Sequence, residues 1–120
     1  PLATVCKYVV PAGYPEGASD DHDDVVVSDE TVLGDTLRRY WAATELDNDG
    51  TVRLTGSRGL AFVGIAGSVA EAEALAESGA SSVSGSVRHR SDIGTASLIE
   101  RRVEHMQTIR RAAGPGAGRR

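Results

Sequence analysis

The chain lacks several features on which large protein classes depend. Its 120 residues include one cysteine, Cys6, and one lysine, Lys7. A lone cysteine excludes a disulfide framework within the chain and favours a reduced, cytoplasmic location, with Cys6 expected in the core of an apolar strand. No apolar run approaches the roughly 20 residues of a membrane-spanning helix, and no signal-peptide pattern is present. We therefore expect no membrane partner.

Aromatic residues and positive charge are also scarce. The chain has one Trp, three Tyr and one Phe, and its 17 acidic residues outnumber its 13 basic residues, for a net charge of -4. Nucleic-acid-binding proteins usually present basic patches, often interleaved with aromatic residues, so we expect no nucleic-acid partner. The length suits a single domain with its own modest core.

Motifs for self-contained catalysis are missing as well. The sequence has no Gly-x-Ser-x-Gly elbow, no phosphate-cradling Gly-x-x-x-x-Gly-Lys-Ser/Thr loop and no Gly-x-Gly-x-x-Gly run. The acidic run 20–24 is interpreted as a solvated turn, because consecutive side chains diverge and cannot all face one ion. The segment 45–50 resembles the start of a calcium loop, but Gly56 stands where the bidentate glutamate belongs. We predict no catalytic, cofactor-binding or metal-binding residue in this chain.

The pattern along the chain predicts an α+β fold, mainly antiparallel sheet with two packed helices. Ser68 and Glu71 form a capping box for the first helix, which Gly79 is expected to break or weaken. The expected strands cover residues 3–10, 25–27, 40–46, 51–55, 60–66 and a short basic strand near 87–90.

A second helix is expected over about residues 95–112. Its apolar residues recur at helical spacing on one stripe, which predicts packing against the rest of the domain. The stripe contains Ala96, Ile99, Val103, Met106 and Ile109. We assign residues 1–112 to the domain and 113–120, rich in glycine, to a disordered tail.

The junction between the basic strand and the second helix is the most informative segment. Arg88 and Arg90 precede a helix start, where free backbone N–H groups and planar guanidinium donors favour an anion such as phosphate. A purely structural interpretation is also open, in which Asp92 or Thr95 caps the helix and the arginines face solvent.

Four segments in order resemble one enzyme family. They are residues 3–15, the turn and strand 57–63, the helix start 68–73 and the junction 90–94. Over about residues 3–110 the chain is similar to the C-terminal domain of phosphoribosylamine-glycine ligase, also called glycinamide ribonucleotide synthetase, and especially to archaeal members. This family belongs to the ATP-grasp ligases of purine biosynthesis.

The resemblance implies an activity for a longer polypeptide. The family uses ATP with Mg²⁺ or Mn²⁺ to activate glycine as an acyl phosphate, which the amine of 5-phosphoribosylamine attacks. ATP and metal would bind mainly to upstream ATP-grasp domains, so these 120 residues would be inactive alone. The start at Pro1, directly before a strand, agrees with a piece of a longer chain. The alternative is a stand-alone α+β module that binds a ligand or partner without catalysis.

The resemblance also implies a set of substrate-binding residues. Ser91 stands where many members have a second basic residue, so phosphate binding would depend on Arg90 alone or together with Arg88. The residues implied for the phosphoribosyl substrate are Arg90, Asp92, Gly94, Arg58 and Tyr14.

Overall fold

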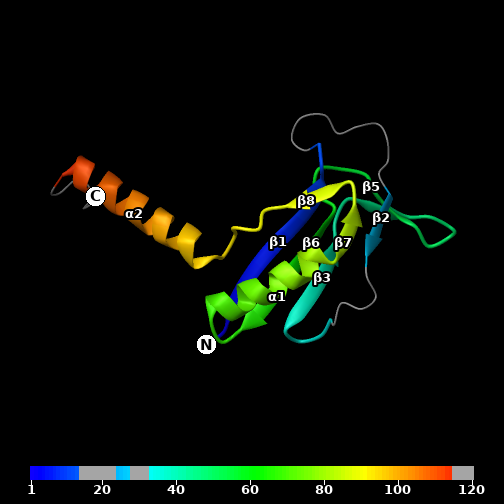
Figure 1. Cartoon of the computed structure of the whole chain (residues 1–120), viewed down its shortest axis with the longest axis horizontal. Helices are drawn as coiled ribbons and strands as arrows, with labels where there is room; N and C mark the ends of the chain where they lie inside the picture. Colours follow the sequence, from blue (N-terminus) through cyan, green and yellow to red (C-terminus); the bar gives the residue numbers. More distant parts are fainter. Residues whose placement is uncertain (14–23, 28–32, 115–120) are drawn as a thin grey trace.

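Two antiparallel sheets and two helices make up the computed structural model, which describes residues 1–13, 24–27 and 33–114 (Figure 1). The first sheet has the strand order β3-β6-β1-β8, with β1 (Ala3–Pro11), β3 (Leu37–Trp41), β6 (Leu60–Ala66) and β8 (Val87–His89). The second has the order β4-β5-β2-β7, with β2 (Asp24–Val27), β4 (Thr44–Leu46), β5 (Val52–Leu54) and β7 (Val83–Gly85). The helices are α1 (Val69–Ser81) and α2 (Ala96–Ala113). The predicted α+β class is confirmed.

Strand β1 organises the first sheet because it lies between β6 and β8. Its residues alternate between a buried face and an exposed face, as the period of a strand requires. Val5, Lys7 and Val9 are buried, whereas Cys6 and Tyr8 are exposed. The expectation that Cys6 belongs to the core is therefore wrong, because its position in the alternation places it on the open face of the sheet.

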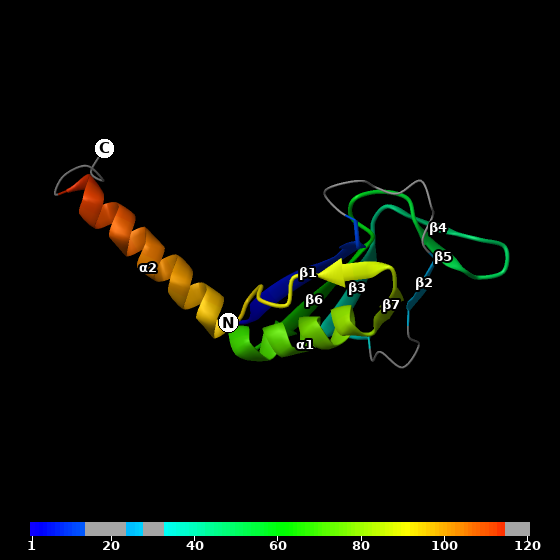
Figure 2. The same cartoon turned by 45° about the horizontal axis from the view of Figure 1, so that its top comes forward.

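Helix α1 covers the buried face of the first sheet and lies along β1 and β6 (Figures 1 and 2). The hydroxyl of Ser68 accepts a hydrogen bond from the Glu71 N–H at 3.2 Å, which confirms the Ser68 half of the predicted capping box. Gly79 does not interrupt the helix, contrary to our expectation. It lies directly over Phe62, whose ring occupies the space that a side chain at Gly79 would need.

The main core forms where α1 and the two sheets meet. Phe62, Leu60 and Val9 are fully buried at its centre. The remaining buried members of this cluster are Val25, Leu37, Leu54, Ala80 and Val83, so each sheet and α1 contribute to it. A smaller cluster of Val5, Ala72 and Ala76 lies nearer the start of α1, and Ile93 packs against it.

The strand expected over residues 40–46 is two strands in different sheets. β3 ends at Trp41 beside β6, and β4 begins at Thr44 beside β5. Between them, the N–H of Ala42 donates to Gly59 and the N–H of Ala43 donates to Arg58. These two hydrogen bonds fix the backbone of residues 42 and 43, where the chain passes from the first sheet to the second without a long connection. A single apolar pattern cannot reveal such a change of partner.

Helix α2 forms where predicted but does not pack, so one of the two expected packed helices is not packed. All its residues are described, and none of them is buried. The apolar stripe is open, with Ile99, Val103, Met106 and Ile109 between 42% and 50% exposed. The helix projects from the two sheets (Figures 1 and 2). Neither helix within the described ranges has the length and apolar character needed to cross a membrane. Residues 115–120 of the proposed tail lie outside the described residues.

Candidate functional site

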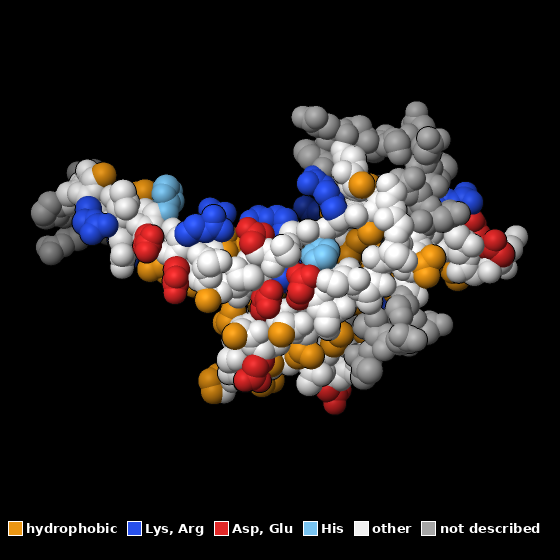
Figure 3. Space-filling view, viewed as in Figure 1, with side chains coloured by type: hydrophobic (Ala, Val, Ile, Leu, Met, Phe, Trp, Pro, Cys, Tyr) orange, Lys and Arg blue, Asp and Glu red, His pale blue; other side chains and the backbone are white. Residues whose placement is uncertain are grey.

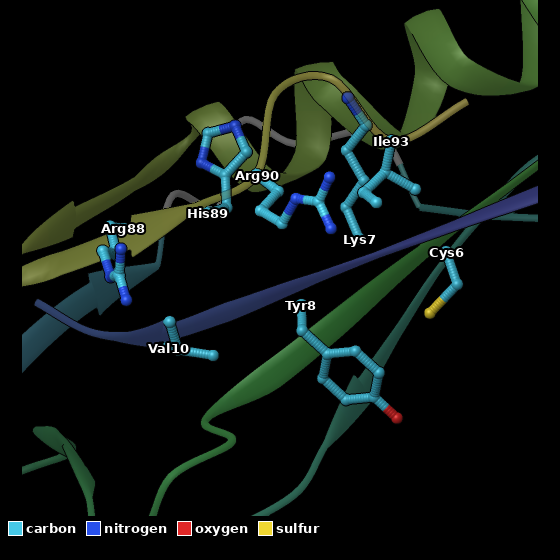
Figure 4. A pocket seen from close by; sticks show the side chains of 8 residues that line it. All are labelled: Cys6, Lys7, Tyr8, Val10, Arg88, His89, Arg90 and Ile93. Carbon is cyan, nitrogen blue, oxygen red and sulfur yellow. The ribbon is translucent and has the colours of Figure 1, made fainter. Parts of the chain in front are cut away.

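A groove runs along the edge of the first sheet, between β1 and the chain that leaves β8. Its volume is about 350 Å³. We call it the β1–β8 groove and define it by its lining residues Cys6, Lys7, Tyr8, Val10, Arg88, His89, Arg90 and Ile93 (Figure 4). Its lining residues come from two segments far apart in the sequence, residues 6–10 and residues 88–93. The groove is the concave feature that contains the predicted basic junction.

Strand register explains which side chains share this groove. Val10 pairs with Arg88 across the β1–β8 ladder, so the two side chains lie on the same face of the sheet as Tyr8. In Figure 4, Tyr8, Cys6 and Val10 project to one side of β1, and Lys7 projects to the other. Beyond His89 the ladder ends, and the segment with Arg90 continues along the open edge of β1. The Arg88 side chain thus lies on the same face of the sheet as the apolar Val10 and the aromatic Tyr8.

Arg90 and Asp92 form a two-point ion pair beside the groove. Nη2 of Arg90 donates to Oδ2 of Asp92 at 2.8 Å, and Nε donates to Oδ1 at 3.1 Å. The hydrogen bond from Arg90 lowers the pKa of Asp92, and the same bond raises the pKa of Arg90. This fork orients the guanidinium plane and leaves its Nη1 group able to donate to an anion.

The predicted helix-start site is only partly present. Thr95 is the N-cap of α2, because its hydroxyl accepts from the Leu98 N–H at 3.4 Å. The structural alternative is therefore correct for Thr95, whereas Asp92 pairs with Arg90 instead of capping. No described residue of α2 lines the groove. The groove at this junction is lined by the arginines and not by the first turn of the helix.

Of the other predicted site residues, Arg58 lies next to the groove without lining it. Its guanidinium stacks over the ring of Tyr8 at 5.6 Å from the centroid, and Tyr8 lines the groove. Gly94 shapes the turn, because its φ of +80° favours glycine and a Cβ there would lie 2.9 Å from Val5. Tyr14 lies outside the described residues.

Lys7 is the residue of this region that our sequence reasoning missed. Its side chain is 0% exposed, and Nζ donates to Glu73 at 3.0 Å, to Glu77 at 2.8 Å and to the carbonyl of Ser91 at 2.8 Å. Burial lowers the pKa of Lys7, but hydrogen bonds to the two carboxylates outweigh burial and raise it. The sequence carries only part of the signal: Lys7 shares one face of β1 with Val5 and Val9, but only the structure shows that α1 covers this face.

Both signs of charge lie on the face shown in Figure 3. Basic side chains follow the path from β8 to α2, with acidic side chains among them, and further acidic side chains lie over α1. Glu77 connects α1 to β8, because its carboxylate also contacts Nε2 of His89 at 2.9 Å. Within residues 1–13, 24–27 and 33–114 there is no group of three or more potential metal ligands. The groove thus places Arg88 and Arg90 beside the apolar side chains of Val10 and Ile93.

Comparison with known proteins shows which family the chain resembles. Residues 4–96 match the family model described as phosphoribosylglycinamide synthetase, C domain. A phosphoribosylamine-glycine ligase of Methanopyrus kandleri is 47% identical over 110 residues, which cover 90% of this chain and 24% of the relative. The corresponding ligase of Methanococcoides burtonii is 46% identical over 109 residues, covering 91% and 24%.

The predicted resemblance to archaeal ligases is thereby confirmed. The chain spans about a quarter of the length of these relatives. The match to the family model ends at Ala96, whereas the archaeal matches cover 90% of the chain and so must continue into the region of α2. Because the family model matches most of the length of this chain, the chain belongs to the phosphoribosylglycinamide synthetase C-domain family.

Proposed function

We propose that this domain is part of a ligase that joins glycine to 5-phosphoribosylamine, and that the β1–β8 groove receives the phosphate-bearing sugar. The observation that carries the proposal is the Arg90–Asp92 fork beside this groove. A guanidinium held in a fixed plane matches the geometry of a phosphate. The relatives named as phosphoribosylamine-glycine ligases supply the substrate class.

The groove residues fall into two chemical groups. Arg90, with Arg88 on the neighbouring strand, would bind the phosphate through charge-assisted hydrogen bonds. Val10 and Ile93 would pack against the carbon skeleton of the sugar, and the Tyr8 ring would form one wall. Such a division is usual in small-molecule sites, where a few polar groups set orientation and apolar surface supplies contact.

Glycine activation is assigned to other parts of the ligase. ATP and Mg²⁺ or Mn²⁺ would supply the energy and the electrophile for amide formation, bound mainly by the ATP-grasp domains of the same polypeptide. The residues described in this chain bind and orient the amine substrate. We place the reaction in the cytoplasm, in agreement with the lone, unpaired Cys6.

The test is steady-state kinetics of the ligase that carries this domain, with Arg90→Ala. A charge-assisted hydrogen bond contributes about 1.5–3 kcal/mol. We therefore expect kcat/KM for phosphoribosylamine to fall by about ten- to a hundredfold, with the KM for ATP nearly unchanged.

Arg53→Ala is the matched control. Arg53 also pairs with an aspartate, Asp47 at 2.8 Å, but it lies in β5 of the second sheet and does not line the groove. It should leave the kinetics with phosphoribosylamine unchanged. If Arg90→Ala instead lowers the melting temperature and leaves all kinetic constants intact, the fork is structural and the proposed function of the groove is wrong.

A further inference from the structure

The turn that carries Arg90 is attached to the body of the domain at three points. Nζ of Lys7 donates to the carbonyl of Ser91, a contact between residues 84 positions apart in the sequence. Ile93 packs against the smaller core cluster. Gly94 lies against Val5 so closely that a Cβ would have to displace it. The turn is thus held on β1 and does not hang freely from β8.

Lys7 is the central one of these attachments, because its bond falls inside the fork itself. Ser91 stands between Arg90 and Asp92, so fixing its carbonyl fixes the backbone that presents both side chains. The side chain of Arg90 is 59% exposed, and its guanidinium pairs with Asp92 of the same turn. The position of the guanidinium therefore depends on the backbone beneath it.

We propose that Lys7 is a positioning residue for substrate binding, which holds the Arg90–Asp92 fork in register with the β1–β8 groove through the carbonyl of Ser91. This inference rests on the proposed function of the groove for its kinetic consequence. The positioning itself rests only on contacts within the chain.

The hydrogen-bond inventory of Lys7 supports this role. An ammonium has three N–H donors, and here they go to Glu73, Glu77 and Ser91. A buried lysine needs its charge balanced, and the two carboxylates do this without help from the turn. The third donor is thus available for the turn, and the rigid triad on β1 and α1 gives it a fixed direction.

If Lys7 served only stability, its loss would not change substrate binding. A pair of variants distinguishes this stabilising role from the positioning role. Lys7→Met by itself leaves two uncompensated carboxylates and could unfold the domain. The triple variant Lys7→Met/Glu73→Gln/Glu77→Gln removes the charges together. Its matched control is Glu73→Gln, which keeps the ion pair between Lys7 and Glu77 and the bond from Lys7 to Ser91. The buried charges balance in both proteins, so their comparison tests that bond.

Two readouts apply to the pair. In this 120-residue chain, labelled with ¹⁵N, we expect the Nε–H signal of Arg90 to be sharp and slow to exchange in the Glu73→Gln control and to broaden in the triple variant. In the ligase that carries the domain, we expect the KM for phosphoribosylamine to be about three- to tenfold higher in the triple variant than in the control, the range for one lost hydrogen bond. The kcat and the KM for ATP should be equal in both.

The outcomes distinguish the two levels of inference. If the triple variant melts at a lower temperature but keeps both the Arg90 signal and the KM of the Glu73→Gln control, Lys7 serves stability only and the positioning role is wrong. If Arg90→Ala leaves the KM unchanged, the proposed function of the groove fails. In that case the Nε–H signal of Arg90 alone tests the positioning role: broadening in the triple variant supports it, and an unchanged signal contradicts it.

Discussion

Glu77 is the residue on which the charges around the groove converge. It accepts hydrogen bonds from Lys7 at 2.8 Å and from the Ser81 hydroxyl at 2.6 Å, and it contacts His89. Burial raises the pKa of Glu77, but these hydrogen bonds, led by that from Lys7, outweigh burial and lower it to about 2. A carboxylate with these partners links α1 to both strands that border the groove.

The depressed pKa predicts an acid dependence of stability. Because the folded-state pKa of about 2 lies below the ordinary value of 4.5, the ionised Glu77 contributes stability that is fully present above pH 4.5. That contribution is lost as the pH falls from about 4.5 toward 2. We expect the melting temperature of Glu77→Gln to fall less steeply over this interval than that of the wild type, as followed by circular dichroism.

Glu100→Gln is the control for this experiment. Glu100 lies on α2, where no residue is buried, so its loss should leave the slope of melting temperature against pH unchanged. Parallel curves for Glu77→Gln and the wild type would show that the cluster around Glu77 does not govern acid stability.

At the scale of elements, the close packing of α1 on β6 depends on a glycine, Gly64, which has no side chain. A Cβ at Gly64 would run into the backbone carbonyl of Ala72, so the helix backbone lies directly over this point of the strand. Ala72 and Ala76 are fully buried there, and small residues on both elements allow the close approach. The position of α1 in turn sets where Glu73 and Glu77 meet β1.

We therefore expect Gly64→Ala to destabilise the domain by about 1–3 kcal/mol, the usual cost of overpacking. Urea unfolding gives the measurement. Gly67→Ala is the control, since a Cβ at Gly67 meets nothing within 4 Å and its effect should stay within about 0.5 kcal/mol. Equal midpoints for the two variants would mean that α1 shifts to accept the methyl group at no cost.

At the scale of the whole molecule, the domain consists of a packed body and a helix that stands apart from it. The chain extends over 62 × 35 × 23 Å, and α2 accounts for the projection visible in Figure 1. Val103 is 50% exposed and Met106 is 47% exposed, whereas Leu60 is fully buried between α1 and the sheets. The free energy of unfolding should therefore depend on the body and very little on the stripe of α2.

A pair of substitutions checks this division. Val103→Gln/Met106→Gln should change the free energy of unfolding by no more than about 0.5 kcal/mol at low micromolar concentration. Leu60→Ala, which opens a cavity in the core, should cost about 2–5 kcal/mol. Chemical denaturation of both variants supplies the comparison. A loss of several kcal/mol in the α2 variant would show that its stripe is covered in solution.

Local sequence determined the elements whose signals lie within a few residues. Alternation set β1, Ser68 and Glu71 set the start of α1, and helical spacing set α2 close to its observed bounds. The junction around Arg90 was also recognisable, because an arginine two residues from an aspartate can pair without any distant partner. These features depend on the period of the backbone and on neighbouring side chains, which a sequence displays directly.

Tertiary structure decided everything that depends on which segments meet. Lys7 became a buried, fully bonded cation because β1 lies between β6 and β8 and beneath α1. Cys6, its neighbour, became exposed for the same reason. The stripe of α2 has the spacing of a buried face, but no sheet surface lies against it. An apolar pattern states which side of an element avoids water, whereas the partner that covers that side is set by long-range pairing, and neighbouring residues carry no information about it.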